Sequence, residues 1–272
     1  MDRIALVISD VDGTLIDTQK RVTERTRQAV GALRARGIGF TVVSSRPPFG
    51  LRMLVEALGI TEPVAAFNGG AIVSPALKIL NQRSIDRDIA REIIAFLDEQ
   101  KIGAWLFTGE EWLTLDPAGA DVERETHTVQ QPPRIVENFD AVIDRAGKIV
   151  GVSDDFARLE AIERQAQSQF AGRAMAVRSQ SYYLDFVALG VDKGVAVREL
   201  SKTIGVPFSQ IVTLGDMEND VPMFRQAGFS IAMGNASDAV KRQAREATLA
   251  NDEDGFAAAV ERLILPRTAA DR

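Results

Sequence analysis

An apolar run that stops at two aspartates is the strongest constraint on how this chain can fold. Residues 4–8, Ile-Ala-Leu-Val-Ile, have the unbroken apolar character of a strand buried in a parallel sheet. The run leads into Asp10-Val11-Asp12-Gly13-Thr14-Leu15. Ligands bind at the carboxyl ends of strands in open α/β sheets, so Asp10 and Asp12 lie where such folds carry their chemistry. The alternative is an N-cap and turn without chemistry.

Strand and helix patterns alternate in two blocks, one up to residue 67 and one from residue 193, and predict a parallel, Rossmann-like α/β sheet with helices on both faces. The first block is followed by a hairpin, formed by residues 72–73 and 77–80, that leaves the sheet. The expected helices are residues 23–36, 49–58, 193–204, 220–227, 236–246 and 256–265. The expected strands are residues 4–8, 38–43, 64–67, 211–214, 229–233 and 248–250.

The pattern changes between the two blocks. Short strands over 105–107, 112–115, 148–152, 175–177 and 182–187 accompany helices over 89–101 and 159–170. Strands that run into one another beside separate helices are typical of an α+β unit. We therefore expect an inserted α+β domain at residues 82–187 and a discontinuous core at 1–81 and 188–272.

Composition narrows the possible functions. The 272 residues contain no cysteine, which excludes disulfides and thiolate metal sites, and the net charge of −6 argues against a general nucleic-acid binder. No apolar run is long enough to span a membrane, and the first residues lead directly into a strand without a signal peptide. We expect a cytoplasmic protein, as a monomer or a homodimer.

Polar residues gather at the ends of the predicted core strands or on the helix between them. The four clusters are Asp10 with Asp12, Ser44 with Ser45, Lys193, and Asp216 with Asn219 and Asp220. Phosphoryl transfer through an aspartyl intermediate needs such a set: a nucleophilic carboxylate, hydroxyl and amine groups that hold phosphate, and a second acid that moves protons. Two adjacent carboxylates also repel unless a cation lies between them, and oxygen ligands of this kind suit Mg²⁺.

The arrangement resembles the haloacid dehalogenase superfamily of phosphohydrolases nearly end to end. Asp10-Val11-Asp12-Gly13-Thr14 is similar to its first motif and Ser44-Ser45-Arg46-Pro47 to its second, where relatives usually carry Thr-Gly-Arg-Pro. Asp192-Lys193-Gly194 and the stretch from Gly215 to Met223 resemble the third and fourth. The insertion between the second and third motifs resembles the Cof-type sugar-phosphate phosphatases with a large α/β cap (class IIB).

That resemblance implies a role for each matched residue. Asp10 is the nucleophile and a metal ligand, and Asp12 is the general acid/base and offers the metal its backbone carbonyl. Asp216 is a further metal ligand, and Asp220 supports the metal through water. Ser44, the amide of Ser45 and Lys193 hold phosphate, with Asn219 nearby. Ser45 replaces a glycine, which tolerates backbone angles that serine does not. The implied cofactor is Mg²⁺, and the implied substrate is a small phosphomonoester.

Several interpretations remain open at this stage. The enzyme could be a phosphosugar mutase of the same superfamily, or the chain could be a phosphorylated receiver or interaction module without turnover. Arg46 either contacts phosphate or forms a surface salt bridge, and Asn68 either forms a turn or lines the site. His127, the only histidine, is expected to be incidental. Trp105, Trp112, Tyr182 and Tyr183 are expected to pack within the inserted domain.

Overall fold

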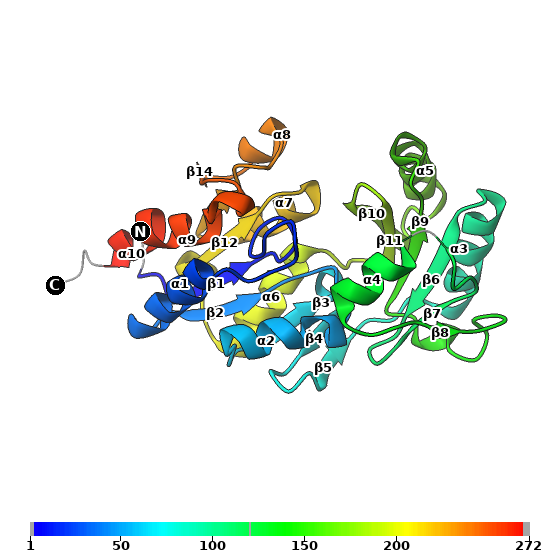
Figure 1. Cartoon of the computed structure of the whole chain (residues 1–272), viewed down its shortest axis with the longest axis horizontal. Helices are drawn as coiled ribbons and strands as arrows, with labels where there is room; N and C mark the ends of the chain where they lie inside the picture. Colours follow the sequence, from blue (N-terminus) through cyan, green and yellow to red (C-terminus); the bar gives the residue numbers. More distant parts are fainter. Residues whose placement is uncertain (1–2, 120, 269–272) are drawn as a thin grey trace.

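The structure is a computed structural model and describes residues 3–119 and 121–268. Two lobes lie side by side, each built around its own sheet (Figure 1). We call the lobe around the parallel sheet the core, and the lobe formed by the second sheet with α3, α4 and α5 the cap. Within the described ranges, no helix is both long and apolar enough to cross a membrane.

The core is built on a five-stranded sheet with the order β14-β13-β12-β1-β2. Every neighbouring pair in this sheet is parallel, so the predicted parallel sheet is confirmed. The strands are β1 (Leu6–Ser9), β2 (Gly39–Val42), β12 (Ile211–Gly215), β13 (Phe229–Ala232) and β14 (Glu246–Ala247).

Helices cover both faces of the core sheet because alternate side chains of each strand point to opposite sides. On β1, Val7 packs in one apolar cluster with Phe256, while Leu6 and Ile8 pack in another with Leu200. The longer core helices are α1 (Glu24–Ala35), α2 (Arg52–Leu58), α6 (Lys193–Ile204), α7 (Val221–Gln226) and α9 (Gly255–Ala259). Shorter turns are η1 (Pro48–Leu51), η4 (Phe208–Gln210), η5 (Glu218–Asp220), α8 (Asp238–Lys241), η6 (Asn251–Glu253), the π-helical η7 (Val260–Ile264) and α10 (Leu265–Thr268).

The third predicted strand leaves the parallel sheet. A single parallel bridge from Val43 to Ala65 joins it to the end of β2. It then pairs in an antiparallel three-stranded sheet, which includes the expected hairpin. This sheet consists of β3 (Val64–Ala66), β4 (Ala71–Val73) and β5 (Ile79–Gln82), with η2 (Phe67–Gly69) between its first two strands.

The cap contains a six-stranded sheet with the order β10-β11-β9-β6-β7-β8, antiparallel except for the β7–β8 pair. Its strands are β6 (Gly103–Phe107), β7 (Trp112–Thr114), β8 (Arg134–Ile135), β9 (Lys148–Val152), β10 (Ala174–Gln180) and β11 (Tyr183–Ala188). Its helices are α3 (Arg87–Glu99), α4 (Val122–Val129), α5 (Phe156–Gln169) and the short η3 (Ile143–Arg145). The exact domain division at residues 82 and 187 stays a prediction.

The two faces of the cap sheet pack differently. Side chains of α3 and α5 form an apolar cluster on one face. On the other face, Trp105 and Trp112 are buried with their ring centroids 5.0 Å apart. These two residues therefore pack, as predicted. Helix α4 meets the core at η1, where Val129 lies against Gly50. Figure 1 shows α4 where the two lobes meet.

Two predicted elements near the end of the chain are wrong. The helix expected over 236–246 is only α8, and the strand expected over 248–250 lies earlier, as β14. The Arg245 amide bonds to the carbonyl of Ser230 at 3.1 Å, which draws the chain to the sheet edge before a longer helix can form. Helix α4 was not predicted, because Val122–Val129 has several β-branched and charged residues and only two apolar ones, Val122 and Val129.

Candidate active site

The predicted carboxylates meet at one edge of the core sheet. Asp10 follows β1 and Asp216 follows β12, and these two strands are hydrogen-bonded neighbours. Asp220 lies in η5, just beyond Asp216. One carboxylate oxygen from each of these three residues lies within 4.8 Å of the others. Parallel strands end at the same edge, which is why residues over 200 positions apart in the chain come together here.

Lys193 lies at the centre of this cluster. Its side chain is 3% exposed, at the first turn of α6, and its Nζ lies 2.6 Å from Asp10 Oδ1 and 2.5 Å from Asp220 Oδ1. The other oxygen of Asp220 accepts the backbone amides of Asp216 and Met217 at 2.8 and 2.9 Å. Both oxygens of Asp220 are therefore engaged, one by Lys193 and the other by two backbone amides, so this side chain supports the cluster.

The cluster carries more negative charge than Lys193 can balance. Burial raises the pKa of Asp10 to about 7 despite the neighbouring Lys193, and Asp220 adds to that rise. Burial and the nearby Asp10 raise the pKa of Asp216 to about 8. A divalent cation would relieve this repulsion, and hard carboxylate oxygens are the donors that Mg²⁺ prefers. The residues present therefore fit the implied metal ion.

Glycine at position 13 leaves the space that Asp216 occupies. A Cβ on Gly13 would lie 2.3 Å from Asp216 Oδ2, and the φ of +83° is itself unfavourable for other residues. The Asp216 carboxylate accepts Thr14 Oγ1 at 3.1 Å and Asn235 Nδ2 at 3.2 Å. Thr14 and Asn235 were not predicted as site residues, although Thr14 belongs to the stretch that resembles the first family motif.

Asp12 faces a different set of partners from Asp10. Its oxygens receive Nε and Nη2 of Arg46, both at 2.8 Å, and Lys20 Nζ at 2.5 Å. Burial alone would raise the pKa of Asp12, but the Arg46 guanidinium and the Lys20 ammonium hold this pKa well below its usual range. Asp12 is therefore an ionised carboxylate here, in the form that can accept a proton.

Arg46 is buried, so the alternative of a surface salt bridge is wrong. Its side chain is 3% exposed, and its Nη1 donates to the carbonyls of Gly50 and Thr128 at 3.3 and 2.9 Å. Burial opposes the charge, but Asp12 outweighs it and raises the pKa of Arg46. The predicted contact of Arg46 with phosphate stays a prediction, since its partners in the structure are the Asp12 carboxylate and two carbonyls.

Ser44 and Ser45 lie directly beyond β2. The Ser44 side chain is buried, and its Oγ accepts the Arg46 amide at 3.1 Å. The backbone of Ser45 does not adopt a positive φ, so serine replaces the usual glycine at this position without that strain. Ser45 also lines the small cavity beside Asp12. Both serines are thus near the carboxylates, as predicted, and their phosphate contacts stay predictions.

Asn68 links the core to the cap. Its backbone is left-handed, with φ 56° and ψ 25°, a conformation that asparagine tolerates better than most residues. Its Nδ2 lies 3.4 Å from Asp185 Oδ2 on β11, and its Oδ1 lies 3.4 Å from Asn219 Nδ2. Asn68 and Asn219 therefore lie next to each other where core and cap meet, and their predicted contacts with substrate stay predictions.

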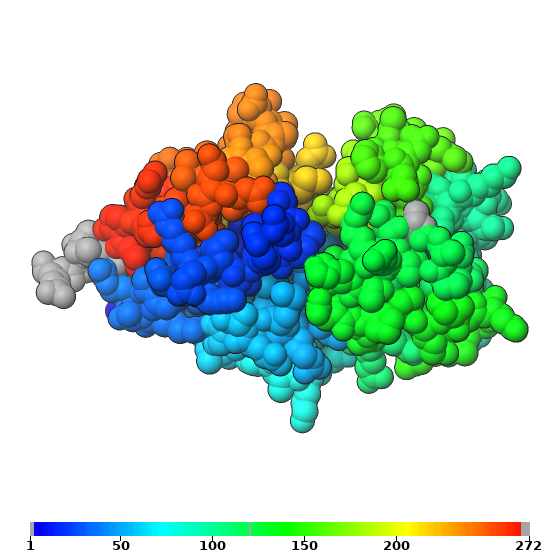
Figure 2. Space-filling view, in the orientation of Figure 1, coloured from blue at the N-terminus to red at the C-terminus, as the bar shows by residue number. Residues whose placement is uncertain are grey.

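The space beside Asp12 is nearly closed. A cavity of about 20 Å³ lies between core and cap, bounded by Asp12, Lys20, Ser45, Arg46, Glu125, Thr128, Lys148, Gln180, Tyr182 and Tyr183. A groove of about 630 Å³ adjoins it and shares Lys20, Thr128, Gln180 and Tyr182 as walls. In Figure 2, the dark-blue segment after β1 abuts the green surface of the cap along this boundary. The structure therefore has the cap closed over the carboxylates.

Several buried polar residues of the cap face this cavity and were missed by the sequence analysis. Burial raises the pKa of Glu125, with Lys148 and Arg46 opposing the rise. Lys148 Nζ lies 3.5 Å from Asp185 Oδ2. Tyr183 is also buried here, and burial together with the neighbouring Glu125 raises the pKa of its hydroxyl. Their positions in the sequence carry no shared motif, so only the fold brings these residues to Asp12.

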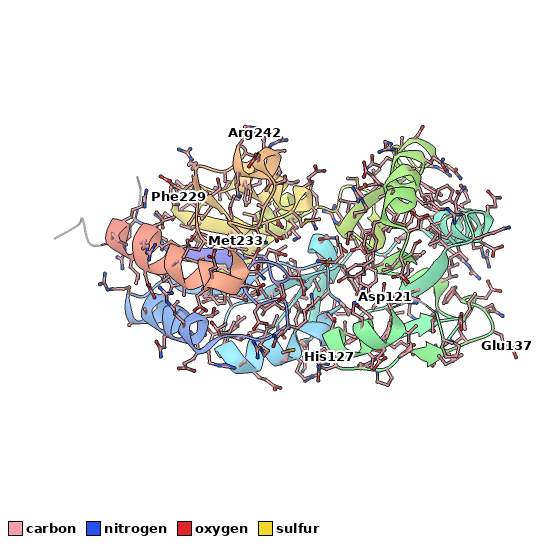
Figure 3. The ribbon with its side chains drawn as sticks, turned by 45° about the horizontal axis from the view of Figure 1, so that its top comes forward. Asp121, His127, Glu137, Phe229, Met233 and Arg242 are labelled. Carbon is pink, nitrogen blue, oxygen red and sulfur yellow. The ribbon has the colours of Figure 1, made fainter. Side chains whose placement is uncertain are left out.

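His127 lies on the exposed side of α4. It lines the open groove together with Gly13 and Lys20, rather than the closed cavity. Figure 3 shows His127 on α4, close to where the cap meets the core. The incidental role expected of His127 stays a prediction.

Comparison with known proteins gives consistent matches. A family model described as haloacid dehalogenase-like hydrolase matches residues 7–260. Phosphatase YwpJ of Bacillus subtilis is 26% identical over 285 residues, covering 95% of this chain and 99% of its own. The 5-amino-6-(5-phospho-D-ribitylamino)uracil phosphatase YwtE of Bacillus subtilis is 25% identical over 282 residues, covering 94% and 96%.

A solved structure agrees with the family match along nearly the whole chain. The crystal structure of a haloacid dehalogenase-like hydrolase from Bacteroides thetaiotaomicron has a TM-score of 0.85 and 27% sequence identity, covering 96% of this chain and 100% of that chain. The predicted resemblance is thereby confirmed. The chain belongs to the haloacid dehalogenase-like hydrolases, and within them it is a phosphatase of the Cof type.

Proposed function

We propose that this enzyme is a Mg²⁺-dependent phosphatase of small phosphomonoesters, in which Asp10 is transiently phosphorylated. The observation that carries the proposal is the group of Asp10, Asp216 and Asp220 around Lys193, buried where the cap closes on the core. A nucleophile, a cation that can hold phosphate and oxygens that can bind a metal ion are then all available at one edge of the core sheet.

In the first step, a carboxylate oxygen of Asp10 attacks the phosphorus of the substrate. The bond between phosphorus and the leaving-group oxygen breaks. Asp12, ionised in the free enzyme, takes up a proton from solvent when the substrate binds and gives it to that oxygen, so an alcohol departs. Lys193 and the Ser44 hydroxyl hold the phosphoryl oxygens while charge develops on them. A bound Mg²⁺ ion, held by Asp10, Asp216 and the Asp12 carbonyl, would offset the negative charge of the carboxylates and the phosphoryl group.

In the second step, water attacks the phosphorus of the aspartyl phosphate. Asp12, now ionised, takes a proton from that water, and the bond between phosphorus and the Asp10 oxygen breaks to release inorganic phosphate. The pairing of Asp12 with Arg46 and Lys20 supports this assignment, since it stabilises the ionised form of Asp12. The nearly closed cavity supports a chemical step protected from bulk solvent.

The buried polar residues of the cap support a hydroxylated leaving group. Glu125 can accept hydrogen bonds, while Lys148 and Tyr183 can donate them. Sugar hydroxyls both donate and accept, so they match such a mixed set. The ribitylaminouracil phosphatase YwtE, by its name, acts on a substrate with a phosphorylated polyol chain. We therefore propose sugar and polyol phosphates as the substrate class.

A phosphate-release screen tests this proposal. The purified protein is incubated with Mg²⁺ and a panel of sugar phosphates, polyol phosphates, nucleotides and pyridoxal phosphate, and both inorganic phosphate and isomerised esters are measured. We expect free phosphate, most rapidly from hydroxylated esters. Isomer formation without phosphate release would assign the mutase activity instead, and a stable phosphoenzyme without either product would assign a receiver.

A further inference from the structure

We infer that Arg46 is a positioning residue for Asp12 and that it couples closure of the cap to the placement of this carboxylate. The inference rests on the proposed function, in which Asp12 is the acid and base. Arg46 gives two parallel hydrogen bonds to Asp12, from Nε and Nη2, each 2.8 Å long. Such bidentate pairing fixes both the position and the plane of a carboxylate.

The remaining nitrogen of the same guanidinium reaches the cap. Nη1 donates to the Thr128 carbonyl at 2.9 Å, in the last turn of α4, and also to the Gly50 carbonyl of the core at 3.3 Å. Carbonyls in the last turn of a helix lack an intrahelical partner and carry partial negative charge. Arg46 therefore completes the end of a cap helix while it holds a core carboxylate.

This link exists only while α4 lies on the core. If the cap lifts, Arg46 loses the Thr128 carbonyl, and water gains access to the Arg46–Asp12 pair. A partly solvated guanidinium holds a carboxylate less firmly than a buried one with every nitrogen engaged. The closed cap therefore fixes Asp12 in one orientation, and the open cap releases it. The charged groups facing Arg46 are Asp12 from the core and Glu125 from α4, with Asp10 further away.

Dependence on the leaving group tests the inference. An oxygen that departs as a poor leaving group needs the proton of Asp12, whereas 4-nitrophenolate leaves without one. We compare kcat and KM for 4-nitrophenyl phosphate, phenyl phosphate and an alkyl phosphate in wild type and Arg46→Met. We expect kcat/KM to fall about 30-fold or more for the alkyl ester and less than about threefold for the nitrophenyl ester. KM should change little.

Arg21→Met is the matched control. Arg21 also pairs with an aspartate through Nε, at 2.8 Å to Asp17, but its side chain is exposed and this partner belongs to the core. This variant should keep the wild-type dependence on the leaving group. Arg46→Lys provides a second test if Arg46→Met folds poorly. The single ammonium of lysine keeps the charge but cannot span both the Asp12 carboxylate and the Thr128 carbonyl in this geometry. Arg46→Lys should therefore show the same selective fall in kcat/KM for the alkyl ester.

Two results would overturn the inference. An equal loss for all three esters would mean that Arg46 is only structural, and a raised KM with unchanged kcat for all of them would mean that it binds phosphate. Wild-type protein that releases phosphate from none of these esters would instead remove the proposed function. The two failures are therefore distinguishable.

Discussion

Gly13 decides how closely the carboxylate of Asp216 can approach the catalytic loop. A methyl group there would meet Asp216 Oδ2 at 2.3 Å. We predict that Gly13→Ala weakens Mg²⁺ binding about tenfold or more, because the displaced carboxylate no longer fits with Asp10. Calorimetric titration with Mg²⁺ measures the change. Gly205→Ala is the control, since Gly205 has a φ of +82° with no atom within 4 Å of its would-be Cβ. Equal affinity losses in both variants would contradict the steric argument.

The raised pKa values of two site aspartates predict how stability varies with pH. Asp10 and Asp216 have pKa values of about 7 and about 8, against an ordinary 3.8. Between about pH 4 and pH 8 the metal-free folded protein binds more protons than the unfolded chain, so its free energy of unfolding falls as pH rises. Glu125 and Asp185 have pKa values shifted in the same direction.

Urea unfolding in EDTA at several pH values measures this slope. Saturating Mg²⁺ should flatten it, because a bound cation favours the ionised carboxylates of Asp10 and Asp216. Asp216→Asn should also reduce the slope in EDTA, since it removes one of the titrating groups. A free energy of unfolding that rises with pH in the metal-free wild type would contradict the charge account of the site.

At the scale of elements, one contact between core and cap is tight enough to test. A Cβ on Gly147, just before β9, would lie 2.6 Å from Cε2 of the buried Phe67 in η2. We predict that Gly147→Ala pushes the cap away from the core, because a packed interface cannot absorb a methyl group without movement. Hydrogen–deuterium exchange of α4 should then increase, and kcat/KM for a sugar phosphate should fall about tenfold.

Gly103→Ala is the control for this prediction. Gly103 also lies in the cap, and its Cβ would make only an ordinary contact, 3.8 Å from the Val152 carbonyl oxygen. In Gly103→Ala, the hydrogen–deuterium exchange of α4 and the activity should match those of the wild type. Unchanged exchange of α4 in Gly147→Ala would show that the Phe67 contact does not hold the cap closed.

The elements also show what the sequence could predict. Apolar runs that end in Asp10 or Asp216 indicated both strands and placed their carboxylates together, because the rule for parallel strand ends is local and general. The switch of β3 into an antiparallel sheet was not predictable, since Val64–Ala66 is apolar enough for either sheet. Helix α4 was missed because only two of its eight residues are apolar, and its position depends on contacts with the core.

The pairing of charged side chains was the least predictable part of the site. Arg46 follows two serines in a loop, and nothing in that stretch indicates that its guanidinium would be buried between Asp12 and a cap carbonyl. Lys148 and Glu125 likewise belong to segments without a recognisable motif. Such contacts arise from the closed arrangement of the two lobes, which depends on interactions between residues far apart in the chain.

For the whole molecule, the metal requirement is the first consequence of the account. We predict that EDTA abolishes phosphate release and that Mg²⁺ restores it. Ca²⁺ should restore it poorly, because its larger and more variable coordination would misplace the attacking oxygen of Asp10. A phosphate-release assay after metal exchange decides this. Full activity in the presence of chelator would remove the metal ion from the mechanism.

The most direct test of the central claim is to trap the phosphate on Asp10. Asp12→Asn should still react with 4-nitrophenyl phosphate, whose leaving group needs no proton, but should lose the base that activates water. We predict a rapid burst of about one nitrophenol per enzyme, followed by turnover slowed about 100-fold or more. Mass spectrometry of the quenched protein should find one phosphoryl group on the peptide containing Asp10, and none in Asp10→Asn. A phosphoryl group on another residue, or turnover by Asp10→Asn within about tenfold of wild type, would contradict the account.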